Sequence, residues 1–257
     1  MKRLIPIIIL ALTTSCVKKK ITPKVVIKPQ LPGVVIKPGT QTQPQSQPAP
    51  QTPPMMGGAM LTQMAPIVFS YSLGVGGYWI WSKDFQPGEW VKFIVTTEDG
   101  SSYTLEIAFL KRTPEGLEWW RVSYIPARNP GESLVYEALF THDLGELKRL
   151  RGKFDDREPQ ELPVTQGSYV GKPVKLTKES IEGATVGVET VRVPAGTFRA
   201  KHVRYGSISG NGSVEWWIDE GVPGGVVRYV VRDHGRVVVT ADLVSFGKGA
   251  KSVLGSF

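Results

Sequence analysis

Apolar and polar residues alternate with a period of two from about residue 67 onward, and this alternation restricts the fold more than any other feature of the chain. Val91, Phe93 and Val95 form one such run, and residues 103–110 form another. Successive side chains of a strand point to opposite faces, so these runs predict β-strands with one buried face. No window of helical periodicity competes with this pattern after residue 67.

Short turn signals separate the alternating runs. Glu98-Asp99-Gly100, Pro114-Glu115-Gly116, Asn211-Gly212 and Asp233-His234-Gly235 are typical of tight hairpins. They predict an all-β fold, a single antiparallel curved sheet or half-barrel of about ten strands. The expected strands are 91–98, 102–111, 117–125, 132–140, 146–153, 187–193, 197–208, 213–219, 225–232 and 236–246. The Pro- and Gly-rich stretch from Glu158 to Thr185 is expected to separate two halves of that sheet.

The N-terminus resembles a bacterial lipoprotein leader. Met1-Lys2-Arg3 is followed by an apolar run, Leu4 to Leu12, and then by Thr13-Thr14-Ser15-Cys16. The resemblance implies a signal peptide over residues 1–15 and lipid attachment, such as palmitate, at Cys16. The apolar run is too short to span a bilayer. Thr13 stands where the family has Leu or another aliphatic residue, so an ordinary secretory signal stays the alternative.

Both readings of the leader predict an exported protein. The lipoprotein reading implies a lipid anchor in the cell envelope, with the domain facing the periplasm. Val17 follows the cysteine where enteric inner-membrane retention has Asp, so the outer membrane is favoured by analogy; the alternative is a soluble periplasmic or secreted protein. Cys16 is the only cysteine. A hydrophobic core, rather than disulfides, must therefore hold the fold.

Residues 16–66 have the composition of a disordered tether. They are rich in Pro and Gln and contain Val-Val-Ile-Lys-Pro twice. Residues 1–66 hold eight Lys or Arg and no acid, and Lys18, Lys19 and Lys20 add attraction to an anionic membrane. Residues 67–257, the expected β domain, hold 23 charges of each sign, so no nucleic-acid partner is expected. The Met-rich patch at 55–64 is either a loose end of the tether or a segment that packs on the domain.

Two stretches resemble uncharacterised bacterial envelope families of the TapB-like kind. Val188 to Ala200, with its Val-Pro-Ala-Gly-Thr-Phe motif, is followed by Val214 to Ile218 and by Val222 to Val227. Gly88 to Pro163 is similar to the opening meander of that family. The resemblance implies an antiparallel β half-barrel, distantly like periplasmic lipoprotein carriers that bind acyl chains, and it brings no established activity.

The sequence contains no pattern that indicates catalysis. His142, His202 and His234 lack the spacing of a metal site, and no Gly-x-Ser-x-Gly nucleophile motif occurs. The glycines at 74–77 do not form a phosphate-binding loop. We therefore expect no enzymatic activity, no cofactor and no metal.

Tryptophans are the strongest binding candidates. Strand alternation assigns Trp120 to the core and places Trp119 and Trp217 on faces that also carry charged residues. Trp79 and Trp81 would share a face if they lie on a strand. Partly exposed aromatic side chains often contact partners or apolar ligands; the alternative is that these rings cover a sheet edge or pack under the tether.

Two functions of different class fit these features. In the first, the tethered β domain binds an acyl chain or another apolar ligand. In the second, it is a non-enzymatic assembly or scaffold factor that docks on another envelope protein. The two hypotheses differ in whether the curved sheet encloses an open apolar cavity.

Overall fold

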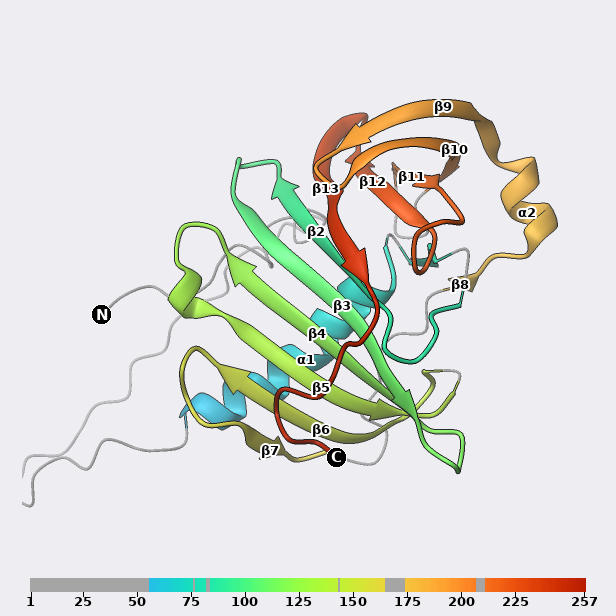
Figure 1. The fold of residues 1–257 in the computed structure, drawn as a ribbon. Helices are drawn as coiled ribbons and strands as arrows, with labels where there is room; N and C mark the ends of the chain where they lie inside the picture. The colour runs from blue at the N-terminus through green and yellow to red at the C-terminus, as the bar shows by residue number, and fades with distance from the viewer. Residues whose placement is uncertain (1–55, 76, 82–83, 143, 165–173, 207–210) are drawn as a thin grey trace, which may run out of the picture. The chain divides into compact units, whose positions relative to one another are not determined.

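A computed structural model describes residues 56–257, apart from residues 76, 82–83, 143, 165–173 and 207–210. Cys16, the expected signal peptide and residues 16–55 of the expected tether lie outside these residues. Within the described part, the chain forms one large antiparallel sheet with a long helix against one of its faces (Figure 1).

The sheet contains all ten strands that the alternation predicts. Burial alternates along Trp90–Thr97, which gives this strand one core-facing side, whereas Ser102–Arg112 and Gly212–Ile218 also bury residues of the opposite side. A short additional edge strand makes eleven. In chain order they are β2 (Trp90–Thr97), β3 (Ser102–Arg112), β4 (Glu118–Pro126), β5 (Leu134–Phe140), β6 (Leu147–Phe154), β7 (Gln160–Leu162), β9 (Thr185–Val193), β10 (Gly196–Gly206), β11 (Gly212–Ile218), β12 (Val226–Asp233) and β13 (Arg236–Gly247).

The sheet has two halves that meet at the first and last long strands. Its order is β7-β6-β5-β4-β3-β2-β13-β12-β11-β10-β9, so β2 pairs with β13 in the middle. We call β2–β7 the first half and β9–β13 the second half. The link between them contains β8 (Val174–Lys175), which pairs in parallel with β1 (Tyr78–Trp79), and helix α2 (Lys178–Gly183). It joins the two edge strands of the sheet.

The second half is strongly curved (Figure 1). The end of β9 folds back toward β12 and β13, where the Ala195 amide donates to the Leu243 carbonyl (3.0 Å) and Arg228 Nη2 donates to the Arg192 carbonyl (3.0 Å). This curvature confirms the expected curved sheet.

Helix α1 (Met56–Leu73) covers one face of the first half, which we call the helix face. Its buried side chains recur at helical spacing, among them Leu61, Ala65 and Phe69. The Phe69 ring lies 5.2 Å from that of Phe140, and the Tyr136 hydroxyl donates to the Leu61 carbonyl (2.9 Å). The helix crosses the boundary expected at residue 66, because the segment from 61 to 65 belongs to the core.

Two α-helical segments, besides the 3-10 turn η1 (Pro130–Glu132), contradict the expectation that no helix follows residue 67. The first is the C-terminal part of α1, which extends beyond residue 67 to Leu73. The second is α2, whose first turn is capped by Thr177: its hydroxyl accepts from the Ser180 amide. Helix α2 has only six residues, and α1 contains Pro66 in its interior.

Candidate functional site

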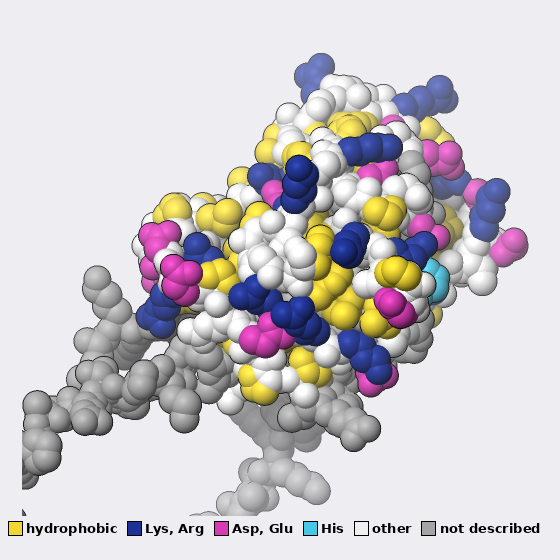
Figure 2. All heavy atoms as spheres, turned by 60° about the horizontal axis from the view of Figure 1, so that its bottom comes forward, with side chains coloured by type: hydrophobic (Ala, Val, Ile, Leu, Met, Phe, Trp, Pro, Cys, Tyr) yellow, Lys and Arg dark blue, Asp and Glu magenta, His cyan; other side chains and the backbone are white. Residues whose placement is uncertain are grey.

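The face of the sheet opposite α1 carries most of the charged strand residues, and we call it the charged face. In the first half, register pairing aligns Arg121 on β4, Glu137 on β5, Arg151 on β6 and Glu161 on β7. Directly paired residues share a face, so these four form a row of alternating charge across the sheet. In Figure 2, charged side chains of both signs are interspersed around hydrophobic ones.

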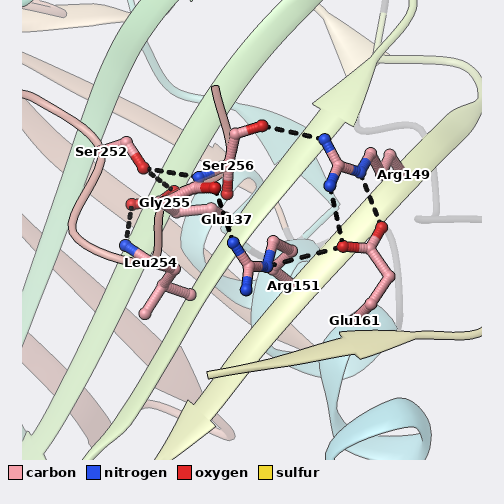
Figure 3. Close-up of polar contacts among 8 residues, drawn as sticks. All are labelled: Glu137, Arg149, Arg151, Glu161, Ser252, Leu254, Gly255 and Ser256. Atoms are coloured by element: carbon pink, nitrogen blue, oxygen red, sulfur yellow. Dashed lines mark hydrogen bonds and ion pairs between the residues drawn. The ribbon is translucent and has the colours of Figure 1, made fainter. Parts of the chain in front are cut away.

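The chain's last ten residues, 248–257, cross this row and are called the C-terminal segment (Figure 1). The Glu137 carboxylate accepts hydrogen bonds from the Val253 amide (2.6 Å), the Leu254 amide (3.3 Å) and the Ser252 hydroxyl (2.6 Å). Figure 3 shows this carboxylate beneath the segment. Glu137 is fully buried, and its charge is satisfied mainly by main-chain donors.

Three arginines bind the carbonyls of the same segment. Arg151 Nη1 donates to the Gly255 carbonyl (2.6 Å) and Arg149 Nη1 to the Ser256 carbonyl (2.8 Å), while Arg121 donates to the Lys251 carbonyl. Each guanidinium is also held by a carboxylate of the sheet, Arg121 by Glu106 and the other two by Glu161 (Figure 3). The arginine side chains are therefore fixed in place by neighbouring strands.

Trp119 lies beneath the C-terminal segment. It is 3% exposed and packs in a cluster with Ala108, Leu110 and Ala250. Its ring is 5.6 Å from that of Phe257. Trp119 lies on the face that alternation predicts, and a segment distant in sequence covers its ring.

In the second half, Glu215 is the centre of the charged face. It is 3% exposed and contacts Arg232 Nε (2.8 Å), Arg204 Nη2 (3.1 Å) and His202 Nε2 (3.0 Å). His202 Nδ1 lies 2.7 Å from Glu189. Both ring nitrogens of His202 thus face carboxylates. We call these five residues the Glu215 cluster.

The environment of Glu215 alters its pKa. Burial is the largest influence and by itself raises the pKa of the carboxyl group. Hydrogen bonds from Arg232, Arg204 and His202 together outweigh burial and lower the pKa below its usual value. The carboxylate therefore stays ionised at neutral pH and holds the two guanidinium groups and the His202 ring in place.

Trp217 adjoins the Glu215 cluster. Register pairing aligns His202, Trp217, Arg228 and Asp242 across four strands. The His202 and Trp217 rings stack with centroids 4.3 Å apart, and the Arg228 guanidinium lies 5.9 Å from the Trp217 ring on the next strand. Trp217 is partly buried, and its indole Nε1 has no hydrogen-bond acceptor among the described residues.

The structure does not bring the other predicted tryptophans to this face. Trp81 is buried, donates to the Leu73 carbonyl (3.1 Å) and packs on Phe85. Trp79 is partly buried on β1, with Lys175 Nζ 5.3 Å from its ring. The two do not lie on one strand, since β1 ends at Trp79. Trp120 is buried in the core, as predicted.

The histidines lie in three separate places. His142 contacts Glu118 (2.7 Å), and His234 contacts Asp233 (2.8 Å) within a hairpin turn. No group of three or more metal-ligating side chains occurs among the residues that the structure describes. In the same part of the chain, no helix is both long enough and apolar enough to cross a membrane.

These features define an antiparallel β-sheet protein with polar contact surfaces on one face. No family model matches the chain, so the TapB-like likeness stays a resemblance, and no curated protein matches it. Among solved structures, the chain is similar to MucB (TM-score 0.38, 14% identity, 77% of this chain and 62% of that chain). It is also similar to MucB in complex with MucA(peri) (0.39, 12%, 77% and 59%) and to the hypothetical protein CT021 from Chlamydia trachomatis (0.42, 9%, 67% and 93%).

The chain spans about three fifths of the length of the MucB chains that it matches. All three TM-scores lie below 0.5.

Proposed function

We propose that this chain is a non-enzymatic cell-envelope factor that docks on another protein through the charged face around Trp217. The observation that supports this proposal is the row of His202, Trp217 and Arg228, whose side chains are held by stacking and by ion pairs. Tryptophan and arginine dominate the binding energy of protein interfaces. Side chains that are already ordered lose little entropy on binding.

Trp217→Ala tests this docking surface against a matched tryptophan. The variant is expected to lose at least tenfold in crosslinking yield to the partner when the full chain is probed in its own cells. Trp79→Ala, at the other partly buried candidate, should retain the yield of the natural protein. Equal yields from natural protein and Trp217→Ala, with unchanged near-ultraviolet circular dichroism, would remove Trp217 from the interface.

Binding of an acyl chain or another apolar ligand is a second candidate. It is favoured by α1, which has no charged residue over its length and covers the apolar helix face. Displacement of such a helix would open an apolar surface. Phe69, Tyr136 and Phe140 fill the interface in the present arrangement, which favours docking over carriage. Native mass spectrometry of protein purified from cells would reveal a retained lipid; a clean protein mass contradicts this candidate.

We further propose that the domain is anchored by lipid at Cys16, faces the periplasm and is held at the outer membrane. The leader resemblance and the lysines after Cys16 support this placement. Metabolic labelling with an acyl-chain analogue should mark the natural protein and leave Cys16→Ser unlabelled. Equal labelling of both would exclude Cys16 as the attachment site, and no labelling of either would favour a soluble exported protein.

A further inference from the structure

The C-terminal segment is bound to the sheet as a peptide ligand would be. It forms no β-strand after Gly247. From Lys251 on, side chains of the sheet bind its main chain. Glu137 accepts hydrogen bonds from two amides, and three arginines donate hydrogen bonds to three carbonyls. Contacts of this kind recognise an extended backbone whatever its side chains are, as in other modes of peptide recognition.

One side chain of the segment supplies an apolar anchor. Leu254 is 3% exposed, whereas the adjacent Val253 is 61% exposed. Gly255 follows with a positive φ of 66°, which lets the chain turn above Arg151. The sequence requirement of this surface is therefore a leucine-sized residue followed by a residue that tolerates the left-handed conformation.

The surface beneath the segment has the composition of a protein interface. Trp119 lies at its centre, with Trp90 and Leu139 packed around it, and the arginines surround this apolar cluster. Interfaces typically have such an apolar centre within a polar rim and are enriched in Trp and Arg.

The segment leaves one polar atom of this surface unsatisfied, and one of its own. Arg151 Nε and Ser256 Oγ are buried without a hydrogen-bond partner among the described residues. Arg151 Nε lies 3.5 Å from Glu161, which is too long for a good hydrogen bond. A different peptide can offer an acceptor to Arg151 Nε and compete with the segment.

We infer that the charged face of the first half is a binding site for an extended peptide of a partner protein, which the C-terminal segment occupies in its absence. The bound peptide presents two successive amides to Glu137 and a leucine at the position of Leu254. This site goes beyond the docking function proposed above, since it uses the other half of the sheet. Either can fail without affecting the other.

The test uses the full chain and a labelled peptide with the sequence of residues 251–257. The attached segment competes at an effective concentration of about 1 mM, so the natural protein is expected to bind the peptide weakly. Leu254→Ser removes the anchor of the attached segment and should bind the peptide at least tenfold more tightly in fluorescence anisotropy. Val253→Ser is the matched control, because Val253 is exposed, and should bind like the natural protein.

Two further variants test the role of Glu137 and provide a substitute in case Leu254→Ser does not fold. Glu137→Gln in the Leu254→Ser background should weaken peptide binding at least tenfold, since the amide acceptor has lost its charge. Gly255→Ala weakens the attached segment through backbone strain and replaces Leu254→Ser if that variant does not fold.

Three results would overturn the inference. The first is absence of peptide binding to folded Leu254→Ser and Gly255→Ala. The second is equal peptide binding with and without Glu137→Gln. The third is concentration-dependent dimerisation of Leu254→Ser that Glu137→Gln abolishes, which would assign the surface to a second copy of this chain.

Discussion

The two halves of the sheet satisfy the buried charges of one face in different ways. In the first half, Glu137 and Arg151 bind the main chain of a segment that comes from elsewhere in the sequence. In the second half, Glu215 binds side chains of its own strand neighbours, Arg204 and Arg232. The C-terminal segment satisfies the charges of the first half, whereas those of the second half are satisfied within the sheet itself.

This difference predicts that exposure of the buried charges is coupled to global unfolding differently in the two halves. If the C-terminal segment leaves, the charges of the first half meet water and the strands can stay paired. In the second half, Glu215 is bound by side chains of the paired strands β10 and β12, so full exposure of its carboxylate is expected when β10, β11 and β12 separate. Detachment of the C-terminal segment is therefore a local opening, whereas exposure of Glu215 is close to global unfolding.

The largest expected effect is that of Glu215→Gln. The change leaves the Arg204 and Arg232 guanidinium groups around a neutral amide, and we expect the free energy of unfolding to fall by about 2–3 kcal/mol. Urea unfolding at pH 7 measures this loss. Glu146→Gln is the matched control, because the Glu146–Lys148 pair is exposed and should change stability by less than about 0.5 kcal/mol. Similar losses for the two variants would show that the Glu215 cluster is not coupled to global unfolding.

The acid dependence of stability should follow the same carboxylate. The folded protein lowers the pKa of Glu215 below its usual 4.5, so its stabilising contribution is complete above about pH 4.5 and is lost as the pH falls through the lower folded value. The natural protein should therefore lose more stability than Glu215→Gln between pH 5 and pH 3. Urea unfolding of both across this range provides the comparison, and parallel pH profiles would contradict it.

Glu137→Gln should have a smaller effect on global stability, about 1 kcal/mol, because the segment can detach while the sheet persists. Its clear signature is local. Hydrogen exchange should become faster at the amides of Val253 and Leu254, which Glu137 binds, and stay unchanged in β11. A global loss as large as that of Glu215→Gln would remove the distinction between the halves.

Phe257→Ala is expected to have the smallest effect. The ring is 52% exposed and contacts Trp119 and the Lys111 ammonium group, 4.2 Å from its centroid. Loss of an exposed cation–π contact costs about 0.5 kcal/mol. Urea unfolding beside Val253→Ala, which should be neutral, measures the difference. A loss above 2 kcal/mol would mean that the segment is an integral part of the core.

The strands could be predicted from the sequence because alternation along each strand reports the burial of its two sides. Helix α1 was missed although Leu61, Ala65, Val68 and Phe69 recur at helical spacing. Ile67 and Tyr71 place apolar side chains on its exposed side, and Pro66 lies in its interior. These residues obscure the stripe that normally identifies a surface helix.

The charged surfaces were harder to predict because they depend on which strands and segments meet. Alternation places Trp119 correctly on a mixed face, yet only the tertiary structure brings Phe257 over it. The sequence around His202 does not indicate its contacts, because its partners Glu189 and Glu215 lie on the two neighbouring strands. Trp217, which strand alternation selected, is the candidate that the structure places in an ordered polar row.

The pairing of β2 with β13 has a consequence for the order in which the domain can form. Every other strand pair of the large sheet joins neighbours in sequence, and these local hairpins can form early. The central pair closes a loop that contains nearly the whole domain, so it can form only after the last strand has been synthesised. Until then, β2 and β12 are unprotected edges, and a nascent or truncated chain is vulnerable there to aggregation and proteolysis.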